Sequence, residues 1–191
     1  MLQEIVLASS SPRRTELLRM IGVPHRVYSI PIDETFLEND SVPNNVMHLA
    51  EKKAFAVAQR EASAYVIGAD TVVVYDNQIF GKPGDDSTAI AMLQTLQGRV
   101  HEVFSGVAVV ASNSLQIHTG YRRVEVKMRE LSLTEIQHYV HTKEPFDKAG
   151  AYAIQGVGAQ FIEWIRGDYY AVVGLPIELT TRLLRASGYQ V

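Results

Sequence analysis

The fold is decided by the stretch Tyr65-Val66-Ile67-Gly68-Ala69-Asp70-Thr71-Val72-Val73-Val74-Tyr75, which is apolar, rich in β-branched residues and interrupted by one acid. Such a run predicts a buried β-strand. Asp76-Asn77 follows and predicts a tight turn into a short strand at residues 78–80. A carboxylate within such a strand is costly to bury unless it is paired, protonated or bound to a metal. Asp70 is therefore a candidate functional residue, and the alternative is an exposed position or a structural ion pair.

Helices and strands are expected on both sides of this central strand. Before it we expect a strand at residues 4–8, a helix from Ser11-Pro12 to Gly22, a strand at 26–30 and a helix at 45–60. After it we expect a helix from Asp85 to Gly98, long strands at 100–110 and 115–128, a short helix after the capping box Ser132–Glu135, a hairpin of 160–165 with 169–173, and a last helix between Pro176 and Gly188. Long hairpin strands among helices predict an α/β fold with a mixed, twisted sheet flanked by helices. No linker is visible, so we expect residues 1–191 to form one domain with two lobes.

The composition excludes several classes of protein. With 47% hydrophobic residues among 191, the chain can form a real core, and its net charge of −3 gives no sign of a nucleic-acid-binding or membrane-binding surface. There are no cysteines, which rules out disulfides and thiolate metal sites. The apolar run at residues 5–8 has no basic segment before it, so it predicts a first strand rather than a signal peptide. We expect a cytoplasmic protein without membrane or nucleic-acid partners.

Two arginines stand in the first turn of the first predicted helix. Arg13 and Arg14 lie where the helix dipole is already positive, which disfavours cations by roughly 0.3–1 kcal/mol each. Together with serine hydroxyls and free backbone amides they could form a receptor for phosphate oxygens. The alternative is that both arginines point into solvent and pair with an acid such as Glu16.

Two lysines and an acidic loop are further candidates. Lys53 falls near the centre of the apolar face of the 45–60 helix, where it either extends past the core to solvent or enters a cavity as a phosphate ligand. Lys82, between Gly81 and Pro83, lies on a rigid turn after the hairpin that follows Asp70, and we expect this hairpin to return Lys82 toward Asp70. The alternative is that Lys82 is only solvated, as turn lysines usually are. Asp33-Glu34 offers carboxylate oxygens of the kind that Mg²⁺ prefers.

Several well-known motifs are missing from the chain. The phosphate-binding loop pattern does not occur, and Gly156-Val157-Gly158 is not a dinucleotide fingerprint, because Phe161 stands where the third glycine belongs. His138 and His141 lack a third ligand at zinc spacing, so we expect both on the surface. No serine-nucleophile elbow occurs either.

Taken together, the segments resemble the Maf family, the septum-formation-inhibitor proteins that are nucleoside triphosphate pyrophosphatases. The matching stretches lie in the family's order along nearly the whole chain: Leu7-Ala8-Ser9-Ser10-Ser11-Pro12-Arg13-Arg14, Ala50-Glu51-Lys52-Lys53-Ala54, Gly68-Ala69-Asp70-Thr71, Gly81-Lys82-Pro83, Asp147-Lys148-Ala149-Gly150-Ala151-Tyr152, Ile154-Gln155-Gly156 and Gly174-Leu175-Pro176. No single piece is specific, but the set is.

The resemblance implies a fold, a reaction and roles for residues. The fold would be elongated and two-lobed, similar to the inosine triphosphate pyrophosphatases, with the substrate in the cleft between the lobes. Water would attack the α-phosphate of a nucleoside triphosphate with the help of a divalent cation, Mg²⁺ or Mn²⁺. Asp70 would be the catalytic carboxylate, and Glu34 and Asp70 would bind the metal. The phosphates would be held by Ser9, Arg14, Lys53 and Lys82.

The resemblance also implies a substrate. Arg13, Thr71 and Gln155 are similar to the branch of the family that acts on dTTP and UTP, with a role in clearing unwanted nucleotides and arresting cell division. A second interpretation is a pyrophosphatase for 7-methyl-GTP or for modified nucleotides broadly. A third is a non-catalytic, nucleotide-binding regulator of division. The family also suggests a homodimer.

Overall fold

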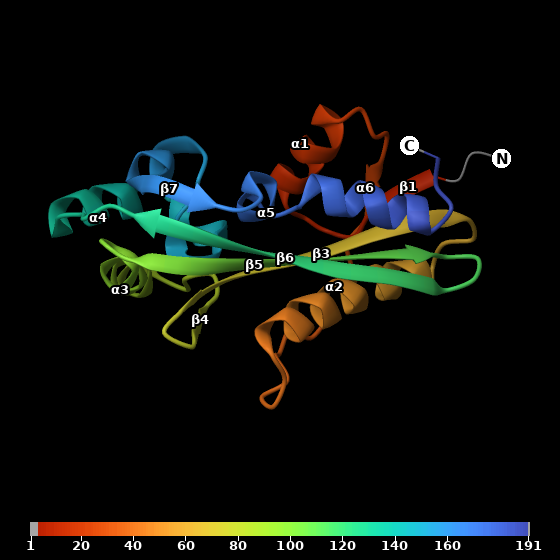
Figure 1. The fold of residues 1–191 in the computed structure, drawn as a ribbon, viewed down its shortest axis with the longest axis horizontal. Coiled ribbons are helices and arrows are strands. Elements are labelled where there is room, and N and C mark those ends of the chain that lie inside the picture. Colours follow the sequence, from red (N-terminus) through yellow and green to blue (C-terminus); the bar gives the residue numbers. More distant parts are fainter. Residues whose placement is uncertain (1–3, 191) are drawn as a thin grey trace. The chain divides into compact units, whose positions relative to one another are not determined.

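The computed structural model describes residues 4–190 and shows an α/β fold (Figure 1), which confirms the predicted fold class. The elements in chain order are β1 (Glu4–Leu7), α1 (Pro12–Met20), β2 (Arg26–Val27), α2 (Val42–Ala58), β3 (Ala64–Tyr75), β4 (Gln78–Phe80), α3 (Asp86–Leu96), β5 (Val100–Ala111), β6 (Gln116–Met128), α4 (Leu133–His141), the 3₁₀ helices η1 (Glu144–Asp147), η2 (Ala149–Ala151) and η3 (Gly156–Phe161), then β7 (Ile162–Arg166), α5 (Tyr169–Val173) and α6 (Ile177–Ala186). No helix within residues 4–190 is both long and apolar enough to cross a membrane.

The strands form one mixed sheet of seven strands, in the order β2-β1-β3-β5-β6-β7 with β4 beside β3. β1 runs parallel to both β2 and β3, and the register pairs Val6 with Val66. β4 pairs antiparallel with β3, and β7 pairs antiparallel with β6. The sheet is therefore mixed, as the long predicted strands indicated.

The chain divides into two compact units. Unit 1 comprises the described residues up to Asp70, Ser105–Arg122, and the residues from Gly174 on; unit 2 comprises Thr71–Phe104 and Arg123–Val173. β3, β5 and β6 each contribute residues to both units.

In unit 1, helix α2 packs very closely on the sheet. A Cβ atom on Gly68 would lie 2.1 Å from the carbonyl oxygen of Ala50, and one on Gly106 would lie 2.4 Å from that of Val46. α2 covers this face, where its small residues join a core of Val6, Ala8, Ala50, Ala54, Val57, Ala58, Ala64, Val66, Ala108 and Val110. α1 and α6 lie on the other face (Figure 1), where Leu179 packs on Gly120.

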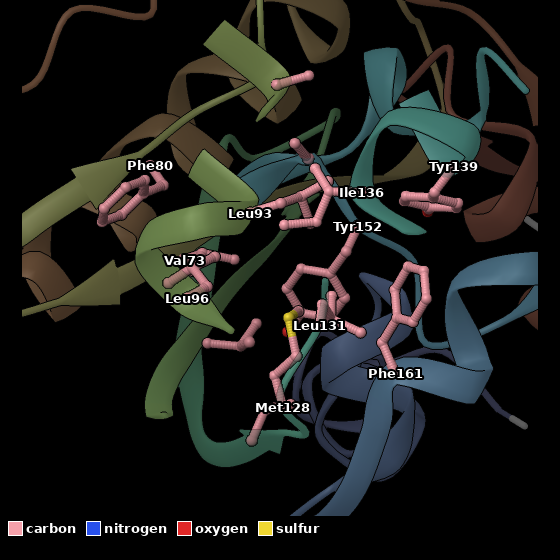
Figure 2. Close-up of a cluster of buried hydrophobic side chains, with 14 of the residues drawn as sticks. Val73, Phe80, Leu93, Leu96, Met128, Leu131, Ile136, Tyr139, Tyr152 and Phe161 are labelled. Atoms are coloured by element: carbon pink, nitrogen blue, oxygen red, sulfur yellow. The ribbon is translucent and has the colours of Figure 1, made fainter. Parts of the chain in front are cut away.

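Unit 2 has a core of its own. Figure 2 shows its side chains: Leu93 and Leu96 come from α3, Ile136 and Tyr139 from α4, and Met128, Tyr152 and Phe161 belong to the same cluster. α3 packs against α4 and η2. The core therefore joins the helices to the strands and to the irregular segment at residues 144–161.

Most predicted helix starts and turns are confirmed. Pro12 is the first residue of α1, and Gly22 follows the end of this helix with φ +70°. Asp76 and Asn77 both have positive φ, as a two-residue hairpin turn requires. The capping box of Ser132 and Glu135 is present at the start of α4.

Other boundaries were wrong. α2 begins at Val42 rather than near Asn45, because Ser41 caps it by accepting from Asn44 N, and β2 ends at Val27 rather than at residue 30. The predicted strand at residues 169–173 is helix α5, because Oδ1 of Asp168 accepts from Tyr170 N at 2.9 Å and so favours a helical turn over the β propensity of this segment. The predicted hairpin does not form, and β7 pairs with β6 instead.

Candidate active site

Asp70 is buried and paired. It lies on β3 with 7% of its surface exposed, and its Oδ1 accepts from Nζ of Lys53 at 2.7 Å. Alternate residues of a strand share a face, so Asp70 points to the same side as Gly68, on which α2 rests. Lys53 follows Ala50, the contact residue of α2, by about one turn. The absence of a side chain at Gly68 thus allows α2 to approach and places the ammonium on the acid.

Lys53 also binds a second carboxylate. Its Nζ lies 2.8 Å from Oε2 of Glu34, whose side chain is 59% exposed. The loop that carries Glu34 is fastened to α2, because Lys52 Nζ donates to the carbonyl of Asp33 at 2.6 Å. Thr35 donates to Asp33 from its hydroxyl and its backbone amide, which lowers the pKa of Asp33. One ammonium is therefore shared between the two predicted metal ligands, so Lys53 does not simply extend past the core to solvent.

Arg14 is held across a long stretch of sequence. Its Nη1 donates to Oγ of Ser9 at 3.0 Å, and its Nε donates to the carbonyl of Gly174 at 2.8 Å. Ser9 Oγ also accepts from the backbone amide of Ser11 at 3.2 Å, and Ser11 makes no side-chain cap of its own. Arg14 thus does not point freely into solvent, and the structure brings together the predicted phosphate ligands Ser9 and Arg14.

Burial and nearby charges act in opposite directions on the pKa of Arg14. Burial lowers the pKa of its guanidinium, the neighbouring Arg13 lowers it further, and the carboxylates of Asp70 and Glu34 partly offset both effects. A guanidinium remains protonated in proteins. A cation next to a second cation and removed from water favours an anion nearby, which is the property expected of a phosphate receptor.

Lys82, Thr71 and Gln155 belong to unit 2. Lys82 is exposed on a turn that is fastened to η2, because Gly150 N donates to the carbonyl of Gly81 at 3.0 Å. Thr71 and Gln155 are half-buried, and Gln155 immediately precedes η3 without capping it through its side chain. That Lys82 approaches Asp70, and that a cleft holds the substrate, stay predictions.

Sequence reasoning missed three residues that support the site. Gly174 provides its carbonyl to Arg14. Asn45 is buried and its amide is hydrogen-bonded to the backbone at Leu37, Asp40 and Ser41, at the end of the loop that carries Glu34. Glu144 binds backbone amides on both residues that follow Gly156. The backbone carbonyl of Gly174 leaves no signal in the sequence. An asparagine at a predicted helix start often bonds to nearby backbone, and this signal could have suggested Asn45.

Fold and site together define an α/β protein with a buried acid and a set of basic groups suited to a polyanion. The profile of the Maf family, described as Maf-like protein, matches residues 4–187. This chain belongs to the Maf family.

Its relatives are similar over their full length. A dTTP/UTP pyrophosphatase of Bacillus cereus (strain AH820) is 47% identical over 190 residues, covering 100% of this chain and 98% of the relative. A dTTP/UTP pyrophosphatase of Bacillus anthracis gives the same figures, 47% over 190 residues with 100% and 98% covered. The solved structure of protein VC0702 from Vibrio cholerae is 12% identical over 75% of this chain and 79% of that one, with a TM-score of 0.41, which is too low to inform fold or function.

Proposed function

We propose that this protein hydrolyses dTTP and UTP to the nucleoside monophosphate and pyrophosphate. The observation that carries the proposal is the buried Asp70 joined through Lys53 to Glu34, in a chain that is 47% identical over its whole length to dTTP/UTP pyrophosphatases. A buried acid that is held by a single ammonium can be released when a polyanion takes that ammonium. The arrangement therefore suits a substrate that carries both phosphates and a cation.

Phosphate binding falls to four residues in this proposal. Arg14 would present its guanidinium edge with Ser9 beside it, and Lys53 and Lys82 would each add a point charge. Phosphoryl transfer depends chiefly on positioning and on neutralisation of charge. These groups would therefore lower the barrier through hydrogen bonds and ion pairs, without forming a covalent bond to the substrate. Asp70 would accept the proton of the water that attacks the α-phosphate.

The residues fit a divalent cation such as Mg²⁺ or Mn²⁺. Asp70 and Glu34 are already arranged around one positive charge, the Lys53 ammonium, at 2.7 and 2.8 Å. Among residues 4–190 no group of three or more acids or histidines could hold a metal. A site of two carboxylates suits Mg²⁺, which usually takes one or two carboxylates and completes its shell with water and substrate phosphates. Once bound, the cation would polarise the phosphoryl oxygens and neutralise developing charge.

Base recognition is assigned to Arg13, Thr71 and Gln155. The amide of Gln155 can donate to O4 and accept from N3–H of uracil or thymine. Cytosine presents the opposite pattern at these two positions, and each polar group left unpaired costs about 1–3 kcal/mol. Arg13 is long enough to reach either the base or a phosphate.

The proposal is tested by a turnover panel. UTP, dTTP, CTP and 7-methyl-GTP are each incubated with the protein and Mg²⁺ or Mn²⁺, and pyrophosphate release is measured. We expect UTP and dTTP to exceed CTP and 7-methyl-GTP. A preference for 7-methyl-GTP would indicate the other branch of the family, and nucleotide binding without turnover would indicate a regulator. The homodimer and the cytoplasmic location stay predictions.

A further inference from the structure

The carboxylate of Glu144 accepts three hydrogen bonds from groups that lie 5, 13 and 14 residues away along the chain. Its Oε2 accepts from the backbone amide of Val157 at 3.0 Å. Its Oε1 accepts from the amide of Gly158 at 2.9 Å and from the hydroxyl of Tyr139 at 2.9 Å. One side chain thus fixes the start of η3 with two hydrogen bonds to the backbone.

Tyr139 holds the other end of the same segment. Its hydroxyl, which donates to Glu144, also accepts from the amide of Ala153 at 3.1 Å. The two side chains form what we call the Glu144–Tyr139 clamp, which binds the backbone at residues 153, 157 and 158. Gln155 lies between these points, so the clamp fixes the backbone on both sides of the residue proposed to read the base.

Gly156 shows how close the clamp lies to the backbone. It has φ +69°, a conformation that other residues rarely adopt, and a Cβ atom there would lie 2.7 Å from Oε2 of Glu144. The residue after Gln155 is therefore glycine for two reasons, its backbone conformation and the carboxylate beside it. A side chain at residue 156 would displace the carboxylate that accepts from the amides of Val157 and Gly158.

The clamp rests on the unit 2 core. Tyr139 is buried on α4 and its ring meets that of Phe161 edge to face, with centroids 4.9 Å apart. Figure 2 shows both rings at one side of the core. Nζ of Lys148 donates to the backbone carbonyl of Glu144 at 3.0 Å, which fixes the start of η1. The clamp is thus attached to a packed helix rather than to a free loop.

The protonation states suit this role. Burial raises the pKa of Glu144, but hydrogen bonds from Gly158, Val157 and Tyr139 outweigh it, so the pKa lies below its usual value and the group is a carboxylate at neutral pH. Burial, followed by the nearby Glu144, raises the pKa of Tyr139. The hydroxyl therefore stays a donor and the carboxylate stays an acceptor.

We propose that Glu144 and Tyr139 are positioning residues for nucleobase selection, which act by fixing the backbone that carries Gln155. The proposal rests on the proposed function, since it needs Gln155 to read a pyrimidine edge. An amide side chain on a mobile segment could turn its donor and acceptor to suit either cytosine or uracil. A fixed backbone holds the start of this side chain at one place relative to the base, so that the groups around the amide can keep one of its two orientations. A mobile backbone would let the amide move away from those groups.

The test measures the ratio of kcat/KM for UTP to kcat/KM for CTP in a double-mutant cycle. Glu144→Gln keeps the shape of the side chain but replaces one acceptor oxygen with an amide nitrogen, so at least one of the three donors loses its partner. We expect the ratio to fall about tenfold, through KM for UTP rather than kcat. Tyr139→Phe, which keeps the ring and removes the hydroxyl, should act in the same direction. Glu163→Gln, an exposed glutamate on β7, is the matched control and should leave the ratio unchanged.

The decisive arm repeats Glu144→Gln in a Gln155→Ala background. If the clamp acts through Gln155, Gln155→Ala lowers the ratio and Glu144→Gln then adds no further change. An equal fall in both backgrounds, or no fall in the single variants, overturns the positioning role while the pyrophosphatase assignment stands. If Gln155→Ala leaves the ratio unchanged, Gln155 does not read the base, and both the clamp proposal and the proposed base recognition fail. If the wild-type protein turned over none of the nucleotides, the proposed function itself would be refuted.

Discussion

At the scale of single residues, the site is organised by one ammonium shared between two carboxylates of unlike environment. The side chain of Asp70 is 9% exposed and that of Glu34 is 59% exposed, so Lys53 matters far more to the first acid than to the second. An exposed ion pair contributes little, whereas removing one member of a buried pair leaves a charge without compensation. Lys53 therefore has a structural role in the free protein as well as the proposed role in phosphate binding.

Asp70→Asn should abolish turnover while the fold survives. The amide has nearly the same shape and can still accept from Lys53, but it cannot take a proton from the attacking water. Loss of a general base costs about 10²–10⁴-fold, and loss of a metal ligand would add to that. The measurement is pyrophosphate release from UTP, with circular dichroism as the check on folding. Activity within a few-fold of wild type in a folded variant would remove Asp70 from the mechanism.

Lys53→Met should make the free protein bind Mn²⁺ more tightly while turnover falls. The ammonium lies 2.7 and 2.8 Å from the two carboxylates that would hold the cation, so it competes with the metal for them. A unit charge at about 4 Å contributes roughly 1 kcal/mol even at the dielectric constant of water, which corresponds to about fivefold in affinity. Electron paramagnetic resonance of free Mn²⁺ measures the binding without nucleotide.

Lys52→Met is the matched control for that experiment. Lys52 stands next in sequence but donates to the backbone of Asp33 and to neither site carboxylate in the described contacts. Its variant should bind Mn²⁺ like the wild type. Equal affinity in all three proteins would show that Lys53 does not occupy the position of the cation.

At the scale of elements, the site depends on how closely α2 lies on β3 and β5. Gly68 and Gly106 both face carbonyl groups of α2 at distances that no Cβ atom could occupy. The same contact sets the distance between Nζ of Lys53 and Oδ1 of Asp70. The packing of α2 and the geometry of the candidate site are therefore coupled through two glycines that have no reactive side chain.

Gly68→Ala should destabilise the protein and lower its activity together. The new methyl group would lie 2.1 Å from the carbonyl oxygen of Ala50, a backbone atom that cannot turn away, so α2 must shift. Overpacking of this kind costs typically about 1–3 kcal/mol. Gly84→Ala is the control, because a Cβ atom there meets nothing within 4 Å. Urea unfolding measures the difference, and equal stability of the two variants would contradict the close packing of α2.

The elements that the sequence predicted well are those with strong local signals. Three predicted features are present: the strand around Asp70, the Asp76-Asn77 turn and the capping box of Ser132 and Glu135. In each of them, residues within the segment itself determine the local structure. Residues 169–173 were predicted to be a strand because they are mostly β-branched and aromatic. The helix cap at Asp168 outweighs this β propensity. The three 3₁₀ helices of residues 144–161 could not be predicted, because long-range hydrogen bonds such as those of Glu144 hold them in place.

At the scale of the whole molecule, the sequence indicates candidate site residues but not which of them are in contact. Arg14 finds its backbone acceptor at Gly174, 160 positions away, and Lys53 finds Glu34 across 19 positions. Ion pairs and backbone contacts at such separations follow from the packing of elements and from no local pattern. The boundary between the two units falls between Asp70 and Thr71, so the stretch that decides the fold contributes to both.

The stability of the whole chain should depend on pH through His101. This residue is 1% exposed on β5, its Nε2 lies 2.7 Å from the hydroxyl of Tyr152, and its Nδ1 has no hydrogen-bond partner among the residues that the structure describes. Burial lowers the pKa of the ring from 6.5 to about 4. The folded protein therefore keeps His101 neutral while the unfolded chain takes up a proton below pH 6.5.

The stability that His101 contributes should be fully present above pH 6.5 and be lost as the pH falls towards about 4. At roughly 1.4 kcal/mol for each unit of pKa, the loss reaches about 3 kcal/mol at the acid end. His101→Phe, which cannot take up a proton, should be less stable at pH 7.5 because the hydrogen bond to Tyr152 is gone, yet it should lose less stability on acidification. His138→Gln changes an exposed histidine on α4 and should keep the wild-type dependence. Urea unfolding from pH 7.5 to 4.5 gives the three curves, and a parallel fall in wild type and His101→Phe would show that the buried ring is not what makes the fold sensitive to acid.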